Sequence, residues 1–218
     1  WIEDFLLRVD GPAVYDRWVE HRIRFDDPRV LDVAHMVFDR WAQSHYIFGG
    51  TGAAAVTNFQ QAGWPLLDGE CMMHRQANFY AAFWPDDADI RPDGNVFAFP
   101  LPGSAENPDV LLTGGQFAAP FDDRPEVQRV VEFLASTDFA DAMAHQTSGA
   151  FLSPHKGVDT SRYRGILARR LGRMLVESDN EVRFDASDLM PSVVGSGTFW
   201  TAVLDCTGHP GEVADAFA

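Results

Sequence analysis

The sequence predicts a protein of the α/β class, and three observations support this prediction. Amphipathic helical periodicity fills most of the first and the last third of the 218 residues. Short apolar runs of strand length stand between these helical regions, and segments rich in proline and glycine separate the runs. Helices and strands do not alternate regularly, which suggests a chain that passes between two lobes more than once.

The clearest helix of the N-terminal third covers residues 30–41. Its apolar side chains recur at helical spacing as Val30, Val33, Ala34, Val37, Phe38 and Trp41. Asp27 followed by Pro28 is typical of a cap and the first helical position. The opening residues are also amphipathic, so we expect Trp1 to pack in the core. A short helix is expected at 53–61, after the glycines of 49–52.

Three apolar runs in the middle of the chain predict buried strands. They are residues 71–73, 96–99 and 110–113, and residues 117–121 would extend the last run. A helix is expected at 77–84. Residues 100–104 are rich in proline and glycine, and they predict a connection between lobes.

The last third of the chain predicts helices again. A helix should begin at 123–126, with Val127, Val130, Val131 and Leu134 on one face. Ser136 and the two residues after it are expected to cap the next helix. A long helix follows over 163–175, and another after Gly197.

Charge and composition argue against several classes of function. The net charge is −15, which argues against a nucleic-acid partner because phosphate binding needs a concentrated basic patch. No apolar run is long enough to predict a transmembrane helix. Cys71 and Cys206 have no neighbours at metal-ligand spacing, and we favour two free thiols over a disulfide. Neither a metal nor a cofactor is expected.

The motifs of common enzymes are not matched. The Gly-Ser-Gly at 195–197 lacks the spacing of a nucleophile elbow. The glycines at 49–52 are not followed by the Lys of a phosphate-binding loop, and those at 114–115 lack the rest of a dinucleotide-binding fingerprint. Carboxylate pairs such as Asp185 and Asp188 could serve glycoside hydrolysis. They stand in turn and cap contexts, however, so we expect a protein that is not an enzyme.

Three groups of residues suggest a binding site instead. Thr198, Phe199 and Trp200 follow glycines at a predicted helix start, while the other two groups follow predicted strands: His74, Arg75, Gln76, and Gly115 with Gln116. Strand ends are where open α/β sheets place ligands. Aromatic faces beside planar polar groups suit a neutral, hydroxyl-rich ligand. From spacing alone, Trp200 could equally be an ordinary core residue.

Five segments, spread over nearly the whole chain, occur in an order that is typical of a known protein family. They read WIEDFLLRVDGPAVYDRWV, CMMHRQANFYAAFWP, VLLTGGQFAAPF, GAFLSPHKGVD and FDASDLMPSVVGSGTFW. Together they resemble the extracellular solute-binding proteins of bacterial carbohydrate ABC importers, and within them the alpha-glucoside-binding group of the maltose-binding-like class.

The resemblance implies a periplasmic-binding-protein-like fold of type II, with a helix-rich C-terminal lobe and a partial N-terminal lobe. Residues 1–99 and 136–218 would belong to the C-terminal lobe. Residues 100–135 would form a hinge crossing and a strand and helix of the first lobe. The chain would then be the C-terminal half of such a protein, and the apolar face of the helix after Pro125 would be partly exposed when this half is alone.

The resemblance also implies a function and a site. Trp200 would stack on a sugar ring, His74, Arg75 and Gln76 would line the second-lobe wall, and Gly115 with Gln116 would lie near the hinge. Phe151 would lie in a loop near the cleft mouth.

The implied ligand is an alpha-glucoside or another oligosaccharide. It would be delivered to the transmembrane permease subunits of an ABC importer by a monomer in the periplasm or outside the cell, with a lipid anchor as one option. A glycoside-active enzyme and a receptor for a polyol, peptide or polyamine are the alternatives.

Overall fold

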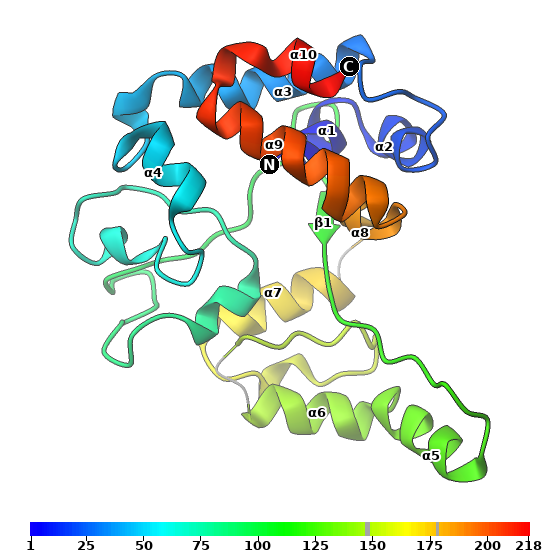
Figure 1. The fold of residues 1–218 in the computed structure, drawn as a ribbon. Helices are drawn as coiled ribbons and strands as arrows, with labels where there is room; N and C mark the ends of the chain where they lie inside the picture. Colours follow the sequence, from blue (N-terminus) through cyan, green and yellow to red (C-terminus); the bar gives the residue numbers. More distant parts are fainter. Residues whose placement is uncertain (147–148, 178) are drawn as a thin grey trace. The chain divides into compact units, whose positions relative to one another are not determined.

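The computed structural model describes residues 1–146, 149–177 and 179–218, which form two compact units (Figure 1). Unit 1 combines Trp1–Thr57, Leu101–Gly114 and Asn180–Ala218. Unit 2 combines Asn58–Pro100 and Gly115–Asp179. The chain therefore passes between the units four times. The assignment of residues to the lobes of a binding protein stays a prediction.

Unit 1 is built mainly from helices. Its longer helices are α1 (Ile2–Val9), α2 (Pro12–Val19), α3 (Pro28–Trp41) and α9 (Trp200–Gly208), and its shorter ones are α4 (Gly50–Val56), α8 (Ala186–Leu189) and α10 (Val213–Phe217). The predicted start of α3 is confirmed, because the Asp27 side chain accepts a hydrogen bond from the Arg29 amide at 3.1 Å. Helices α3, α9 and α10 contact one another (Figure 1).

The core of unit 1 collects the apolar faces of these helices. Leu6, Trp18 and Val30 are fully buried, and the predicted apolar face of α3 lies among them. Burying a large apolar side chain contributes about 1.5–3 kcal/mol. This core therefore holds together segments from both ends of the chain.

A two-stranded parallel sheet completes unit 1. Strand β1 (Val110–Thr113) pairs with β2 (Glu181–Phe184), and Val110 lies opposite Glu181. The strand at 110–113 was predicted. Strand β2 was not, because its sequence EVRF places charged side chains at two of four positions and lacks an apolar run. Helices together with a parallel strand pair agree with the predicted α/β class.

Unit 2 contains α5 (Pro125–Leu134), α6 (Thr137–Gln146) and α7 (Ile166–Val176). The start of α6 was predicted, and the Phe139 amide donates to Ser136 Oγ at 3.2 Å. The small core consists of Ala140, Ala144, Val158, Tyr163 and Ala168. Tyr163 lies before α7 rather than inside it, and its hydroxyl accepts a hydrogen bond from the Ser153 amide at 2.8 Å.

Two predicted strands and one extension are wrong. Residues 71–73 form no strand, and Met72 is 95% exposed. Of 96–99, only Val96 pairs, in an isolated bridge with Ile90. Residues 117–121 do not extend β1, and Phe121 is fully exposed. A short apolar run forms a strand only where a partner strand lies beside it, and that partner is not visible in the run itself.

Two predicted short helices differ in extent or type. The helix expected at 53–61 is α4, which begins earlier and ends at Val56. The segment expected as a helix at 77–84 is a 3-10 helix over Asn78–Ala82. Further 3-10 turns cover Ser44–Tyr46, Trp64–Leu66, Thr160–Arg162 and Pro210–Glu212.

Candidate functional site

The Gly-Ser-Gly-Thr step before Trp200 lies in a π-helical segment, Val193–Phe199, that runs directly into α9. Gly195 is buried there against the backbone of Ser187, in a space that leaves no room for a Cβ atom. π-helical turns are rare and often occur at functional sites. The glycine thus allows the segment to pack on the start of α8, and it sets where the next two rings point.

The side chains of Phe199 and Trp200 point in different directions and differ in their exposure to solvent. Phe199 is 8% exposed, and its ring contacts the rings of Trp18 and Phe25 at centroid distances of 5.6 and 5.5 Å. Trp200 is 59% exposed. Neighbouring helical residues are about 100° apart, so the two rings point in different directions. Phe199 is therefore a core residue in this structure, and Thr198 and Trp200 are exposed.

A small hollow of about 100 Å³ lies beside the Trp200 ring in unit 1. We call it the Trp200 pocket; it is lined mainly by apolar and aromatic residues, namely Trp1, Ile2, Glu3, Val37, Phe38, Trp41, Ser187, Phe199, Trp200 and Val203. Trp1 is 41% exposed, so the expectation that it packs in the core is wrong. Ligand pockets usually measure about 300–1,000 Å³, so this hollow could hold only part of a sugar.

Glu3 supplies the one carboxyl group of the pocket wall, within the part of the chain that the structure describes. Its Oε1 accepts a hydrogen bond from the Ser187 amide at 2.7 Å. Burial raises the pKa of Glu3 to about 8, and a hydrogen bond to Asp185 and the charge of Asp185 act in the same direction. Glu3 is therefore largely protonated at neutral pH.

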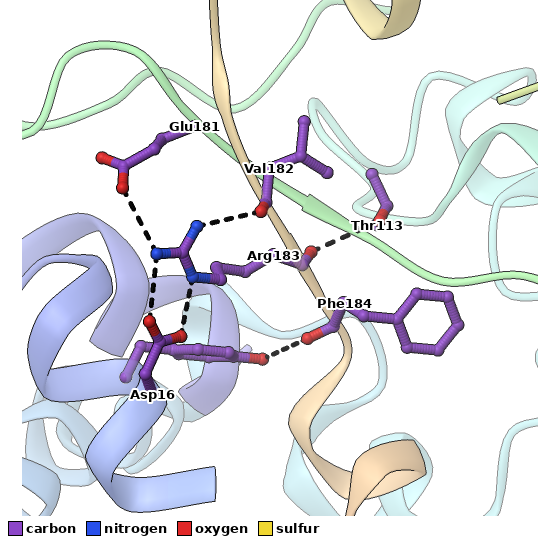
Figure 2. Close-up of polar contacts among 7 residues, drawn as sticks. Asp16, Thr113, Glu181, Val182, Arg183 and Phe184 are labelled. Carbon is purple, nitrogen blue, oxygen red and sulfur yellow. Dashed lines mark hydrogen bonds and ion pairs between the residues drawn. The ribbon is translucent and has the colours of Figure 1, made fainter. Parts of the chain in front are cut away.

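Strand β2 is held by polar contacts with α2 (Figure 2). Arg183 donates to both carboxylate oxygens of Asp16 on α2, at 2.7 and 3.0 Å. Tyr15 on the same helix donates its hydroxyl proton to the Phe184 carbonyl at 2.8 Å. Ser187 Oγ then donates to Asp185 Oδ1 at 3.1 Å. Paired charge-assisted hydrogen bonds restrict orientation, so the network positions the residues that hold Glu3.

The other predicted site residues lie in unit 2. The His74 ring is half-buried beside Tyr80, with 4.9 Å between ring centroids, and burial lowers the pKa of His74. Its Nε2 is buried and has no hydrogen-bond partner among the described residues. Gln76 is exposed, and its Oε1 accepts a hydrogen bond from the Ala77 amide at 2.9 Å. Arg75 is half-buried.

Asn78 joins two of the predicted segments within unit 2, although the sequence analysis did not select it. Its Nδ2 donates to the carbonyl of Ala150 at 2.9 Å, which brings the segment after His74 next to the one that carries Phe151. Phe151 is half-buried, and its ring lies 6.0 Å from that of Phe139. Gly115 and Gln116 are exposed on the segment that follows β1.

The described part of the chain shows no group of three or more His, Cys, Asp or Glu that could hold a metal. Cys71 and Cys206 are free thiols, as favoured from the sequence. Among the helices of residues 1–146, 149–177 and 179–218, none is long and apolar enough to cross a bilayer.

Comparison with known proteins finds two informative relatives. The osmoprotective compounds-binding protein GgtB of Synechocystis sp. is 39% identical over 211 residues, which make up 95% of this chain and 49% of that protein. The alpha-glucosides-binding periplasmic protein AglE of Rhizobium meliloti is 32% identical over 212 residues, or 95% of this chain and 45% of that protein.

The chain thus spans about half the length of the curated relatives it matches. No protein-family model and no solved structure matches it significantly. Both relatives are binding proteins, and both align with 95% of this chain. Over nearly its whole length the chain is thus homologous to solute-binding proteins of ABC transporters.

Proposed function

We propose that this chain contributes the Trp200 wall of a sugar site in an ABC-importer receptor. The ligand is an alpha-glucoside or a related hydroxyl-rich compound, held between the two lobes of the complete protein and then delivered to the transmembrane permease subunits. The protein acts in the periplasm or outside the cell and makes no covalent bond to its ligand. This ligand class is supported by the two relatives, of which one binds osmoprotective compounds and the other binds alpha-glucosides.

The observation that carries the proposal is the exposed Trp200 ring above an apolar hollow that contains one neutral carboxyl group. An indole face covers the C–H face of a sugar ring, while carboxyl and amide groups bond its hydroxyls. The hollow is too small to enclose a disaccharide, so further walls are needed. The resemblance to solute-binding proteins supports further ligand contacts for His74, Arg75, Gln76, Gly115, Gln116 and Phe151.

Ligand binding then acts as a population shift. A sugar that contacts both lobes favours the closed arrangement over the open one by its differential affinity. Remote hydrogen bonds contribute orientation, and stacking on Trp200 contributes much of the apolar contact. Loss of this ring should therefore weaken binding without unfolding the protein.

Replacement of Trp200 tests the proposal. We expect Trp200→Ala to weaken binding of maltose, trehalose or sucrose by at least about tenfold, which corresponds to ~1.4 kcal/mol. Trp200→Phe should restore most of the affinity because it keeps a flat ring. Isothermal titration calorimetry on the protein that carries this sequence measures the sugar affinities of both variants.

Tyr46→Ala is a matched control, since Tyr46 is exposed in unit 1 and lies outside the pocket. Equal affinity in Trp200→Ala and wild type would contradict the site. Binding of sorbitol or spermidine, with no response to any sugar, would change the ligand class. Steady release of glucose from maltose would favour the enzyme alternative.

A further inference from the structure

Glu3 stands out in unit 1 because it is a carboxyl group in a wall of aromatic rings. Helices α3 and α9 contribute only apolar residues to the described pocket wall, including Trp41 and Trp200. The Ser187 amide donates to Glu3 at 2.7 Å from a position 184 residues away in the sequence. Such a contact between distant segments orders Glu3 at the pocket edge.

The polar surroundings of Glu3 come from three elements. Asp185 lies on the connection between β2 and α8 and is hydrogen-bonded to Glu3. Tyr15 faces the pair from α2, and Asp4, which forms an ion pair with Arg8, lies beside it on α1. The Ser187 amide opposes the other effects, because its hydrogen bond favours the charged form of Glu3.

A hydrogen bond between two carboxyl groups requires a proton on one of them. The proton resides on Glu3, whose pKa burial raises to about 8. In this state the Glu3 hydroxyl donates to Asp185, and Oε1 accepts from the Ser187 amide and retains a lone pair for a ligand hydroxyl. Above about pH 8 Glu3 loses this proton and becomes negatively charged.

We propose that Glu3 is a specificity-determining residue of the Trp200 pocket, which accepts a hydroxyl of a neutral ligand and binds it most tightly while the Glu3–Asp185 pair holds its shared proton. This inference rests on the proposed function, because it assigns a second contact to the same site. It also explains why a strongly acidic chain presents a neutral wall at this surface.

The sign of the pH effect follows from burial. A neutral ring that stacks on Trp200 removes water from the pocket, and desolvation disfavours the charged form of an acid. Ligand binding therefore raises the pKa of Glu3 further. Below about pH 8 the proton is already present and affinity is constant, whereas at higher pH binding must take up a proton and the affinity falls.

Calorimetric titrations with maltose, trehalose and sucrose at pH 6.5, 7.5, 8.5 and 9.5 test this coupling. We expect the wild-type dissociation constant to rise about tenfold over this range. Buffers of different ionisation enthalpy should reveal proton uptake on binding near pH 9. Glu3→Gln is the decisive variant, because its amide can donate to Asp185 and accept from Ser187 as protonated Glu3 does. Its affinity should stay close to the wild-type value at pH 6.5 throughout the range.

Glu20→Gln serves as the matched control, since Glu20 is paired with Arg22 at the exposed end of α2, outside the pocket wall. It should keep the wild-type pH profile. Sugar binding with the same pH profile in wild type and Glu3→Gln would overturn the role of Glu3 and leave the proposed function intact. No binding of any sugar by wild type at any pH would overturn both.

Discussion

At the scale of single residues, the sequence step before Trp200 decides which ring faces solvent. Gly195 packs against the Ser187 backbone, and the π-helical segment leads Phe199 into the core and Trp200 out of it. A side chain at position 195 would meet the carbonyl of Ser187. The glycine is therefore required by the close approach of the Ser187 backbone.

The substitution Gly195→Ala tests whether position 195 requires a glycine. We expect it to lower the free energy of unfolding by about 1–3 kcal/mol, because overpacking displaces backbone. Urea denaturation followed by circular dichroism measures the loss. Gly208→Ala is the control, since Gly208 has open space around a Cβ atom and should cost little or nothing. Equal stability of Gly195→Ala and wild type would show that the segment can shift without cost.

At the scale of elements, β2 is the part of unit 1 that connects the sheet with the pocket. Its backbone pairs with β1, its Arg183 is bound by Asp16 (Figure 2), and it leads directly into Asp185 and Ser187. Arg183 is mostly buried along its side chain, whereas Asp16 is about half exposed. The ion pair between Arg183 and Asp16 therefore contributes more to the orientation of β2 than to the stability of the fold.

Replacing Arg183 by Lys should separate these two contributions. Lys keeps the charge but loses the bidentate geometry, so we expect a loss of about 1 kcal/mol in the free energy of unfolding. Sugar affinity should also fall, because Asp185 and Ser187 are less firmly placed. Arg22→Lys is the control, as it alters an exposed ion pair and should change stability by less than about 0.5 kcal/mol. Equal losses of unfolding free energy in Arg183→Lys and Arg22→Lys would argue against an orienting role of the ion pair between Arg183 and Asp16.

At the scale of the whole molecule, α5 shows that the chain leaves an apolar face without full cover. Val130 is 57% exposed and Phe133 is 52% exposed, and Val127 and Val131 are only half-buried. The sequence predicted this exposure from the resemblance to a longer protein. Contiguous exposed apolar surface favours association between molecules.

Val130→Glu should therefore reduce self-association of the 218-residue chain at micromolar concentration. A charge in the middle of the apolar face opposes the burial that drives association. Size-exclusion chromatography with light scattering measures the degree of self-association. Gln128→Glu adds the same charge at a polar position of α5 and should change association little. An equal decrease in both variants would attribute association to net charge instead.

The sequence by itself determined the local structure and the family. Helical periodicity and Asp27 predicted α3, Ser136 predicted the start of α6, and the order of five motifs indicated the solute-binding family. These features are local, since caps and periodic faces depend on residues a few positions apart. Strand predictions failed at 71–73 and 96–99 because strand pairing is not local.

Only the tertiary structure decided the composition of the Trp200 pocket. The sequence singled out Trp200, but it treated Phe199 as an equal partner, placed Trp1 in the core and did not select Glu3. The contact of Glu3 with Ser187 and the pairing of β1 with β2 join segments from distant parts of the chain. Such contacts depend on how helices and strands pack around one core, and no short pattern in the sequence encodes that packing.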